Sequence, residues 1–427
     1  MIPPLHRRAF LARTTIYSFG LAAAPLLARA QTSKSPGEKL VVGVMGLGRG
    51  FDHVKALQQI ANVEVAYLAD IDDTRIAKAQ KSAFATAEKP PKSVQDFRRI
   101  LDDKAVDALF IAAPNHWHAP ATILACAAGK HVYVEKPGSH NAREGELMVT
   151  AARKHQRVVQ MGNQRRSWPG IFEAVEKLRA GAIGEVRSAR TWYNNARGTI
   201  GHGQPAPVPA NLDYDLWQGP APARPYVDNL VHYNWHWRWH WGGGEIANNG
   251  PHAFDLARWG LGVEHPTRVT CGGGRYHFKD DQETPDTSIA TVDFGGKCLV
   301  WDGSSCHPRN NEKLPFVAWY GDGGTLAIYG NGYKIFDPKG KEIGEGTAGG
   351  GDKGHIENFL QSIRGDAKPN SEIAVGQTST LLCHLSNIAY RTGHTIHFDP
   401  VTRKIIGDKA AEQLWSREYR PGWEPKV

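Results

Sequence analysis

The sequence predicts an α/β protein in which a doubly wound parallel sheet is followed by a second α/β domain rich in antiparallel strands. Strand-like apolar runs alternate with helical runs between residues 39 and 162, the usual pattern of a parallel sheet. From residue 185 onward the strands show period-two alternation and are separated by Gly-Gly or Asp-Gly turns, as in antiparallel hairpins. A chain of 427 residues is long enough for two such domains.

The first 30 residues have the order of regions found in a twin-arginine export signal. Residues 6–13, HRRAFLAR, are followed by an uncharged, largely apolar run and then by the small-x-small sequence Ala-Arg-Ala at 28–30. We therefore expect residues 1–30 to be a signal peptide for the twin-arginine export machinery and residues 31–38 to be a linker. The protein would then be periplasmic or otherwise exported. An uncleaved membrane anchor is the alternative.

The net charge does not point to a nucleic-acid partner. The formal charge is +8, but residues 1–30 supply four arginines and no acidic residue, so the remaining chain carries +4. No run rich in lysine and arginine marks a nucleic-acid footprint. The five cysteines are scattered without CxxC spacing, and they do not demand a disulfide.

A glycine-rich turn follows the first predicted strand. The strand at 40–45 precedes GLGRG and a helix predicted at 52–60, an arrangement that turns a glycine motif into a dinucleotide site. Glycines let the backbone approach a pyrophosphate at the helix N-terminus. The strict G-x-G-x-x-G spacing is not met, because Phe51 stands where the third glycine should be. We assign four residues of this turn to cofactor binding: Gly46, Gly48, Arg49 and Gly50.

The next strand, at 63–69, ends on Asp70, 24 residues beyond Gly46. An acidic residue at about this distance binds the adenosine ribose 2′-hydroxyl, and its charge repels a 2′-phosphate. Asp70 therefore favours NAD over NADP, although Arg75 nearby leaves NADP open. Capping of the following helix is the alternative role for Asp70.

A short strand within residues 131–137, HVYVEKP, ends on Glu135 and Lys136 before a proline. This places Lys136 at the carboxyl edge of the parallel sheet, where ligands of such sheets bind. The proline removes a backbone donor, so the strand cannot run past this point. A surface lysine at a strand end is the alternative. The other elements of this domain are predicted as helices at 94–101, 119–128 and 142–154 and strands at 108–112 and 158–161.

The loop at 113–118, APNHWH, lies at the same edge of the sheet. Its two histidines are spaced like metal ligands, but no carboxylate or cysteine completes a set, so we predict no metal site. In the second domain we predict strands at 185–193, 267–272, 287–294, 298–304, 315–320 and 325–329 and helices at 169–180, 253–260, 356–363 and 377–392.

The segment 231–241, VHYNWHWRWHW, is unusually aromatic. Indole rings suit the C–H faces of pyranose sugars, and the polar residues between them can bind hydroxyl groups. Trp235 and Trp237 are therefore candidate substrate contacts. An aromatic loop core and a dimer contact are the alternatives. Three histidines recur every four residues, but the alternating tryptophans favour an extended or irregular segment over a zinc-binding helix face.

Together, GLGRG, Asp70, PNHWH and VEKP resemble the glucose–fructose oxidoreductase / inositol dehydrogenase (Gfo/Idh/MocA) family. The resemblance implies a Rossmann domain at 39–162 and a C-terminal domain at 163–427 with a large, open, mostly antiparallel sheet. It also implies a homodimer or homotetramer, a late helix at 377–392 near the Rossmann domain, and Lys136 in the active site.

The sequence from Gly242 to His252 resembles the active-site helix of this family, with Asn248 where the family has Asp. An amide cannot take a proton, so the acid/base role is assigned to Lys136 and His252. The resemblance places seven residues near the cofactor in addition to those of the glycine turn: Asp70, Pro114, Asn115, His118, Glu135, Lys136 and Gln164. Seven are expected near the substrate: Lys136, Gln164, Tyr193, Trp235, Trp237, Asn248 and His252.

These features predict hydride transfer between a nicotinamide and a hydroxyl-bearing carbon of a sugar or sugar derivative. Outside the cytoplasm there is no free NAD pool, so we expect the cofactor to be held tightly and recycled within the catalytic cycle. One alternative is an NAD-dependent glycosidase of the same family, which oxidises the sugar transiently, eliminates and returns the hydride. A second is a regulator that binds sugar or nucleotide without catalysis.

Overall fold

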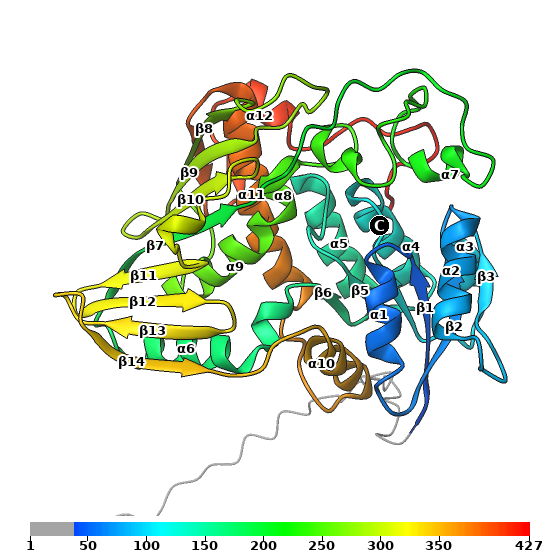
Figure 1. Ribbon diagram of the computed structural model, residues 1–427, viewed down its shortest axis with the longest axis horizontal. Coiled ribbons are helices and arrows are strands. Elements are labelled where there is room, and N and C mark those ends of the chain that lie inside the picture. The colour runs from blue at the N-terminus through cyan, green and yellow to red at the C-terminus, as the bar shows by residue number, and fades with distance from the viewer. Residues whose placement is uncertain (1–37) are drawn as a thin grey trace, which may run out of the picture. The chain divides into compact units, whose positions relative to one another are not determined.

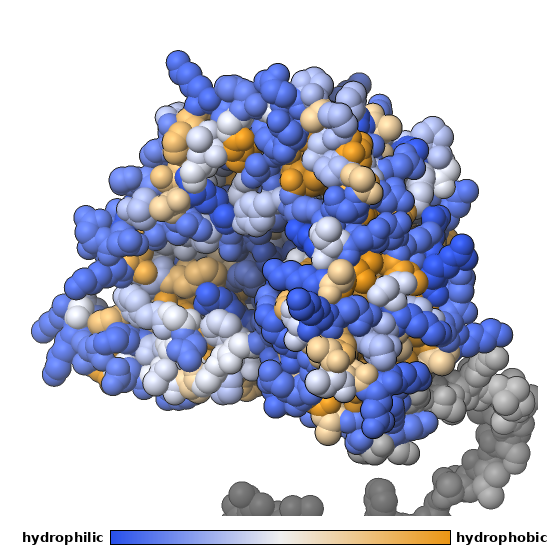
Figure 2. Space-filling model, turned by 45° about the vertical axis from the view of Figure 1, so that its right-hand side comes forward, coloured by the Kyte–Doolittle hydropathy of each residue, from blue (hydrophilic) through white to orange (hydrophobic). Residues whose placement is uncertain are grey.

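The computed structural model describes residues 38–427, which contain two β-sheets with helices packed against them (Figure 1). The predicted signal peptide and residues 31–37 of the predicted linker lie outside the described residues. Within the described part, no helix is long and apolar enough to span a membrane. On the face shown in Figure 2, hydrophobic side chains form small groups scattered among hydrophilic ones.

The first sheet is parallel, with strand order β3-β2-β1-β4-β5-β6, which confirms the predicted doubly wound sheet. Its strands are β1 (Leu40–Met45), β2 (Val63–Ala69), β3 (Lys92–Val94), β4 (Ala108–Ile111), β5 (His131–Val134) and β6 (Val159–Met161). The accompanying helices are α1 (Gly50–Leu57), α2 (Asp73–Ala83), α3 (Arg98–Asp102), α4 (Asn115–Ala127) and α5 (Ala142–Lys154).

Two details of this domain differ from the prediction. Residues 92–94 pair with β2 as an edge strand, so the helix predicted from residue 94 begins only at Arg98. Helix α4 begins at Asn115 and not at residue 119, so most of the predicted 113–118 loop is its first turn. Pro120 removes the donor that would bond the His116 carbonyl, and Arg417 Nη2 donates to this oxygen instead at 2.8 Å.

The second sheet has ten strands in the order β14-β13-β12-β11-β7-β10-β9-β8-β15-β16. Only its β7–β10 pair is parallel, as the predicted mostly antiparallel sheet requires. The strands are β7 (Val186–Asn194), β8 (Arg268–Gly274), β9 (Thr287–Asp293), β10 (Cys298–Ser304), β11 (Val317–Gly321), β12 (Gly324–Tyr329), β13 (Gly332–Phe336), β14 (Glu342–Thr347), β15 (Ile396–Asp399) and β16 (Lys404–Ile405). The last four were not predicted. β14, EIGEGT, is mostly polar and exposed, so it lacks a hydrophobic signal.

The remaining helices connect and cover the sheets. They are α6 (Pro169–Arg179), α7 (Tyr214–Gln218), α8 (Gly244–Asn248), α9 (Gly250–Leu261), α10 (Lys353–Arg364), α11 (Ile373–Thr392) and α12 (Lys409–Gln413), with short 3₁₀ turns at Gln164–Ser167, Asn234–Trp237 and Asn310–Glu312. Helices α6, α9 and α11 share one hydrophobic core with the second sheet. Helix α11 also contacts β6 and α5, so it joins the two parts of the structure (Figure 1).

Candidate active site

A cavity of about 450 Å³ lies at the carboxyl edge of the parallel sheet. The glycine turn and the ends of β2, β4 and β5 form one wall, and residues between β7 and α9 form the other. Eleven of the predicted site residues line it: Gly46, Gly48, Arg49, Asp70, Pro114, Asn115, His118, Glu135, Lys136, Trp235 and Asn248. Gly50, Gln164, Tyr193, Trp237 and His252 do not.

The glycine turn brings the backbone close to the sheet. Gly46 has a φ of +85°, and a Cβ there would lie 2.5 Å from the Ala112 carbonyl oxygen. A Cβ on Gly50, at the start of α1, would lie 2.9 Å from Val44 Cγ1. Helix α1 can therefore begin directly beside β1, so the cavity-lining residues Gly46, Gly48 and Arg49 lead straight into a helix N-terminus, the kind of element that binds a pyrophosphate. These residues fit a dinucleotide.

Asp70 is fixed at the edge of the cavity. Its carboxylate accepts the Leu47 N–H at 2.6 Å and the Asp72 N–H at 3.0 Å. Burial raises the pKa of Asp70, and these backbone hydrogen bonds and the charge of Arg75 oppose the rise. Both Asp70 and Arg75 line the cavity, so the position expected to contact the ribose combines a carboxylate with a nearby guanidinium.

Lys136 is held by α8, the helix that has Asn248 where the family has Asp. Its Nζ donates to the Asn248 backbone oxygen at 2.7 Å and to the Asn248 side-chain oxygen at 2.8 Å. Burial lowers the pKa of Lys136, while the charges of Glu135 and Glu245 raise it. A buried amine with a lowered pKa is suited to proton transfer near neutral pH.

Glu245 is a site residue that the sequence analysis missed. It is only 4% exposed and forms an ion pair with Arg197 at 2.7 Å. Asn248 Nδ2 donates to it at 3.3 Å, and Asn249 Nδ2 also donates to it. A hydrogen-bonded chain therefore runs from Lys136 through Asn248 to Glu245 and Arg197. The sequence does contain a sign of this role: Glu245 is an acidic residue only three positions before Asn248.

Glu135 organises the other side of Lys136. Burial alone would raise its pKa, but the hydrogen bond from His53 and the charges of Arg49 and Lys136 hold that pKa well below its usual value. His53 Nε2 lies 2.9 Å from Glu135, and Gln164 Nε2 donates to it at 2.9 Å. Gln164 therefore supports Glu135 directly, in a position behind the cavity wall.

His118 is buried and His252 is half-buried, and burial lowers the pKa of both imidazoles. Burial and the charge of Lys136 hold the pKa of His252 well below 6.5, and its Nδ1 has no hydrogen-bond partner among the described residues. Both nitrogens of His118 face carbonyl oxygens, of Pro137 at 2.6 Å and of Ala113 at 2.7 Å. His118 therefore holds the backbone around Lys136, whereas His252 retains a free ring nitrogen.

Residues 195–243, here called the covering segment, form the second wall of the cavity. Trp217, His232, Tyr233, Trp235 and His236 of this segment line it. The ring of His236 stacks on Trp235 at 3.6 Å, and its Nδ1 lies 2.6 Å from the Tyr233 carbonyl oxygen. Burial lowers the pKa of His236 to about 3. His236, like Trp217, His232 and Tyr233, is thus a cavity residue that the sequence analysis did not assign.

The other two predicted residues of this region, the buried Trp237 and the half-buried Tyr193, support the site from outside the cavity lining. Trp237 is 2% exposed, and the Arg197 guanidinium lies 4.9 Å from its ring centre. The Tyr193 hydroxyl accepts from Asn195 and Arg197 at 2.9 and 3.1 Å. Three histidines of the covering segment bind separate partners: His232 pairs with Asp72, His236 faces Tyr233 and His240 faces Pro222.

The covering segment is attached to the parallel sheet beside Asp70. His232 Nε2 lies 2.8 Å from Asp72, and Asn211 Nδ2 donates to the same carboxylate at 2.8 Å. The Asp213 N–H donates to the Ile71 carbonyl oxygen at 2.9 Å. These contacts form a clasp, defined here as Asn211, Asp213 and His232 with Asp72 and Ile71, across the end of the cavity beside Asp70.

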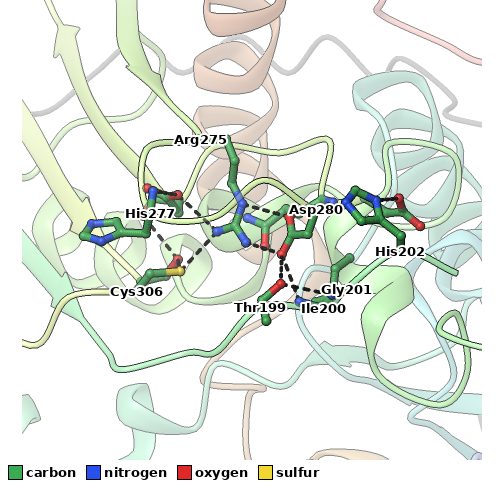
Figure 3. Close-up of polar contacts among 12 residues, drawn as sticks. Thr199, Ile200, Gly201, His202, Arg275, His277, Asp280 and Cys306 are labelled. Carbon is green, nitrogen blue, oxygen red and sulfur yellow. Dashed lines mark hydrogen bonds and ion pairs between the residues drawn. The ribbon is translucent and has the colours of Figure 1, made fainter.

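The covering segment is also attached to the second domain (Figure 3). Asp280 accepts from Thr199 Oγ1 and the Ile200 N–H, both at 2.9 Å, and pairs with Arg275. The adjacent Asp281 accepts from Arg238 at 3.0 Å. The segment is therefore anchored to both domains.

Comparison with known proteins identifies both domains. Residues 40–163 match the NAD-binding Rossmann fold of an oxidoreductase family, and residues 186–425 match the C-terminal alpha/beta domain of that family. An aldose-aldose oxidoreductase from Caulobacter crescentus superimposes with a TM-score of 0.66 at 20% identity, covering 84% of this chain and all of that one. This likeness supports the fold.

Similar sequences include three curated proteins. The uncharacterized oxidoreductase YrbE of Bacillus subtilis is 27% identical over 271 residues, 62% of this chain and 67% of that protein. An inositol 2-dehydrogenase of Salmonella paratyphi B is 29% identical over 160 residues, 37% of this chain and 46% of that protein. A glycosyl hydrolase family 109 protein of a Shewanella strain is 27% identical over 212 residues, 44% of this chain and 46% of that protein. The chain thus spans less than half the length of the last two. Because the two family matches together cover most of its length, the chain belongs to the Gfo/Idh/MocA family of NAD(P)-binding oxidoreductases.

Proposed function

We propose that this protein is a carbohydrate oxidoreductase that moves a hydride between NAD and a hydroxyl-bearing carbon, and that it keeps its cofactor between turnovers. The observation that carries the proposal is the position of Lys136 in the dinucleotide cavity, with its Nζ held 2.8 Å from the Asn248 side-chain oxygen. The inositol 2-dehydrogenase among the relatives supports a polyhydroxylated substrate.

Each residue of the site has a separate role in this reaction. Bound nicotinamide would accept or supply the hydride, with the glycine turn and Asp70 holding the dinucleotide. Lys136 takes the hydroxyl proton during oxidation and returns it during reduction, since burial lowers its pKa. The charge of Glu245 limits that lowering. His236 lines the cavity and donates from Nδ1 to the Tyr233 carbonyl oxygen, so its Nε2 can accept a hydrogen bond from a sugar hydroxyl.

Cofactor retention is supported by the covering segment. Export through the twin-arginine pathway, which we propose from residues 1–30, would separate the enzyme from the cytoplasmic NAD pool. The clasp onto Asp72 covers the cavity next to Asp70, where the adenosine ribose of a bound cofactor would lie. The carboxylate of Asp70 favours NAD over NADP. Release of the cofactor would require these contacts to break.

Native mass spectrometry of protein purified without added nucleotide tests this function. About one NAD or NADH per chain surviving dialysis supports retention. Sugars should then change the absorbance of the bound nicotinamide, and a second carbonyl compound should reverse the change. Protein that binds NAD only loosely contradicts retention, and protein whose bound nicotinamide never responds to sugars contradicts the oxidoreductase.

A second candidate is an NAD-dependent glycosidase. The Shewanella relative and the Asn248 departure favour it. Such an enzyme would release the alcohol from an aryl glycoside without net change in bound NADH, whereas an oxidoreductase would leave the glycoside intact.

We also propose a homodimer or homotetramer. Hydrophobic side chains of the second sheet remain exposed, among them Ile289 at 52%, Tyr329 at 40% and Tyr320 at 38%. Sedimentation equilibrium measures the mass of the assembly, and a monomer at micromolar concentration would contradict the proposal.

A further inference from the structure

A second cavity, of about 570 Å³, shares no lining residue with the dinucleotide cavity. It lies where residues 222–224 and 239–243 of the covering segment meet the start of α5, the end of α11 and the chain at 414–418. Helices α5 and α11 are in contact with each other. Its volume is in the range of small-molecule sites.

The charges around this cavity are mostly positive. Arg224, Arg391 and Arg417 line it, and Glu418 is the only lining carboxylate. Within residues 38–427, neither Arg224 nor Arg391 forms an ion pair; their guanidinium groups lie over Trp241 and Trp239 at 5.7 and 5.1 Å. These two cations are therefore available to an anionic ligand.

Arg417 adds a directed donor. One side of its guanidinium pairs with the buried Glu144 at 2.8 Å, and its Nη2 also donates to the His116 carbonyl oxygen. Its Nη1 is buried and has no hydrogen-bond partner among the described residues. A buried donor without a partner is costly, so a ligand acceptor at this position would be stabilising.

Two residues that line the cavity, His140 and Asn387, each carry a buried acceptor that lacks a donor in the described chain. His140 Nε2 lies 3.1 Å from the Trp239 carbonyl oxygen and donates to it, which leaves Nδ1 as an unpaired acceptor. Asn387 is 8% exposed; its Nδ2 donates to the Gly243 carbonyl oxygen at 2.8 Å, and its Oδ1 is unpaired. A bare anion would be repelled by these atoms, whereas a hydroxyl group would donate to them.

We propose that this cavity binds a sugar acid. Its carboxylate would be held by Arg391, Arg224 and Arg417 Nη1, and its hydroxyls would donate to His140 Nδ1 and Asn387 Oδ1. The site is separate from the dinucleotide cavity, and its occupation does not depend on the catalytic function proposed above.

Isothermal titration calorimetry on the full protein saturated with NAD tests the site, with D-glucuronate, D-glucose and inorganic phosphate as probes. Glucuronate should bind with one site per chain, and at least about tenfold more tightly than either other probe, because only it supplies both a carboxylate and several hydroxyls. Equal affinity for phosphate, or no binding of glucuronate, would overturn the proposal.

Variants locate the site. Arg391→Gln and, separately, Arg224→Gln should weaken glucuronate binding at least about tenfold. Arg268→Gln is the matched control, since this arginine lies exposed on β8 and should leave binding unchanged. Lys136→Met should also bind glucuronate as tightly as the unmodified protein. If both cavity variants bind normally, or if Lys136→Met alone abolishes binding, glucuronate is occupying the active site and the inference is wrong.

Discussion

The clasp between the covering segment and Asp72 should control how fast the cofactor leaves. The double variant Asn211→Ala/His232→Ala removes both side-chain contacts to the Asp72 carboxylate, each 2.8 Å long. Asp72 keeps its capping bonds to Thr74, so α2 retains its N-terminal cap. The substitution therefore loosens the clasp without disturbing the helix that follows β2.

The expected size follows from these two contacts. A hydrogen bond to a charged group contributes about 1.5 kcal/mol at the lower end of the measured range. Two such bonds amount to about 3 kcal/mol, and each 1.4 kcal/mol is a factor of about ten. If both break before the cofactor leaves, its dissociation should accelerate about 100-fold. Asn211 does not line the cavity, so its loss cannot remove a direct contact with the cofactor. Asn211→Ala alone should still accelerate cofactor dissociation about tenfold, because it removes one of the two bonds.

Displacement of bound NADH by excess NAD, followed by nicotinamide fluorescence, gives the dissociation rate. Asn310→Ala is the control, because this exposed asparagine lies in the turn before β11, far along the chain from the clasp. If the double variant releases NADH at the rate of the control, the covering segment does not retain the cofactor and the reasoning fails.

Three further predictions concern the site and its support. Lys136→Met should lower turnover roughly 10²- to 10⁴-fold, while nucleotide titration shows unchanged NAD binding; a loss of NAD binding instead would refute a proton-transfer role. Glu245→Gln removes a charge that raises the pKa of Lys136. The pH at which the oxidation rate rises, measured by stopped flow, should therefore be lower in this variant. A shift to higher pH would contradict the assignment of Lys136 as the base. Asp255→Ala leaves Arg166 buried without its partner at 2.7 Å and should lower the free energy of unfolding, measured in urea, by about 3–5 kcal/mol. Asp293→Ala breaks an exposed ion pair and should lower that free energy by about 1 kcal/mol or less.

The sequence predicted the parallel sheet well because each buried strand is a continuous apolar run followed by a helix. It failed where that signal is weak: β3 is a three-residue edge strand, and β14 is nearly all polar. Within the site, short motifs predicted the residues at strand ends, including Asp70 and Lys136. Glu245 was missed because its importance arises from folding, which places Arg197, 48 positions earlier in the chain, against it.

The covering segment was predicted only in part for a similar reason. Its aromatic density indicated a binding surface, and Trp235 does line the cavity. Nothing in the local pattern distinguishes Trp235 from Trp237, yet the latter lies beneath the Arg197 guanidinium. Such a difference depends on long-range contacts, which periodicity and spacing do not encode.

Arg197 belongs to the covering segment, and its ion pair with Glu245 reaches Lys136 through Asn248. Under the proposed function, the enclosure of the cofactor and the pKa of Lys136 therefore depend on one chain of contacts. An engineer who shortened the segment to open the enzyme to exchangeable NAD would also leave Glu245 without its cation. A successful redesign would have to supply a replacement positive charge at Glu245, or accept a different working pH.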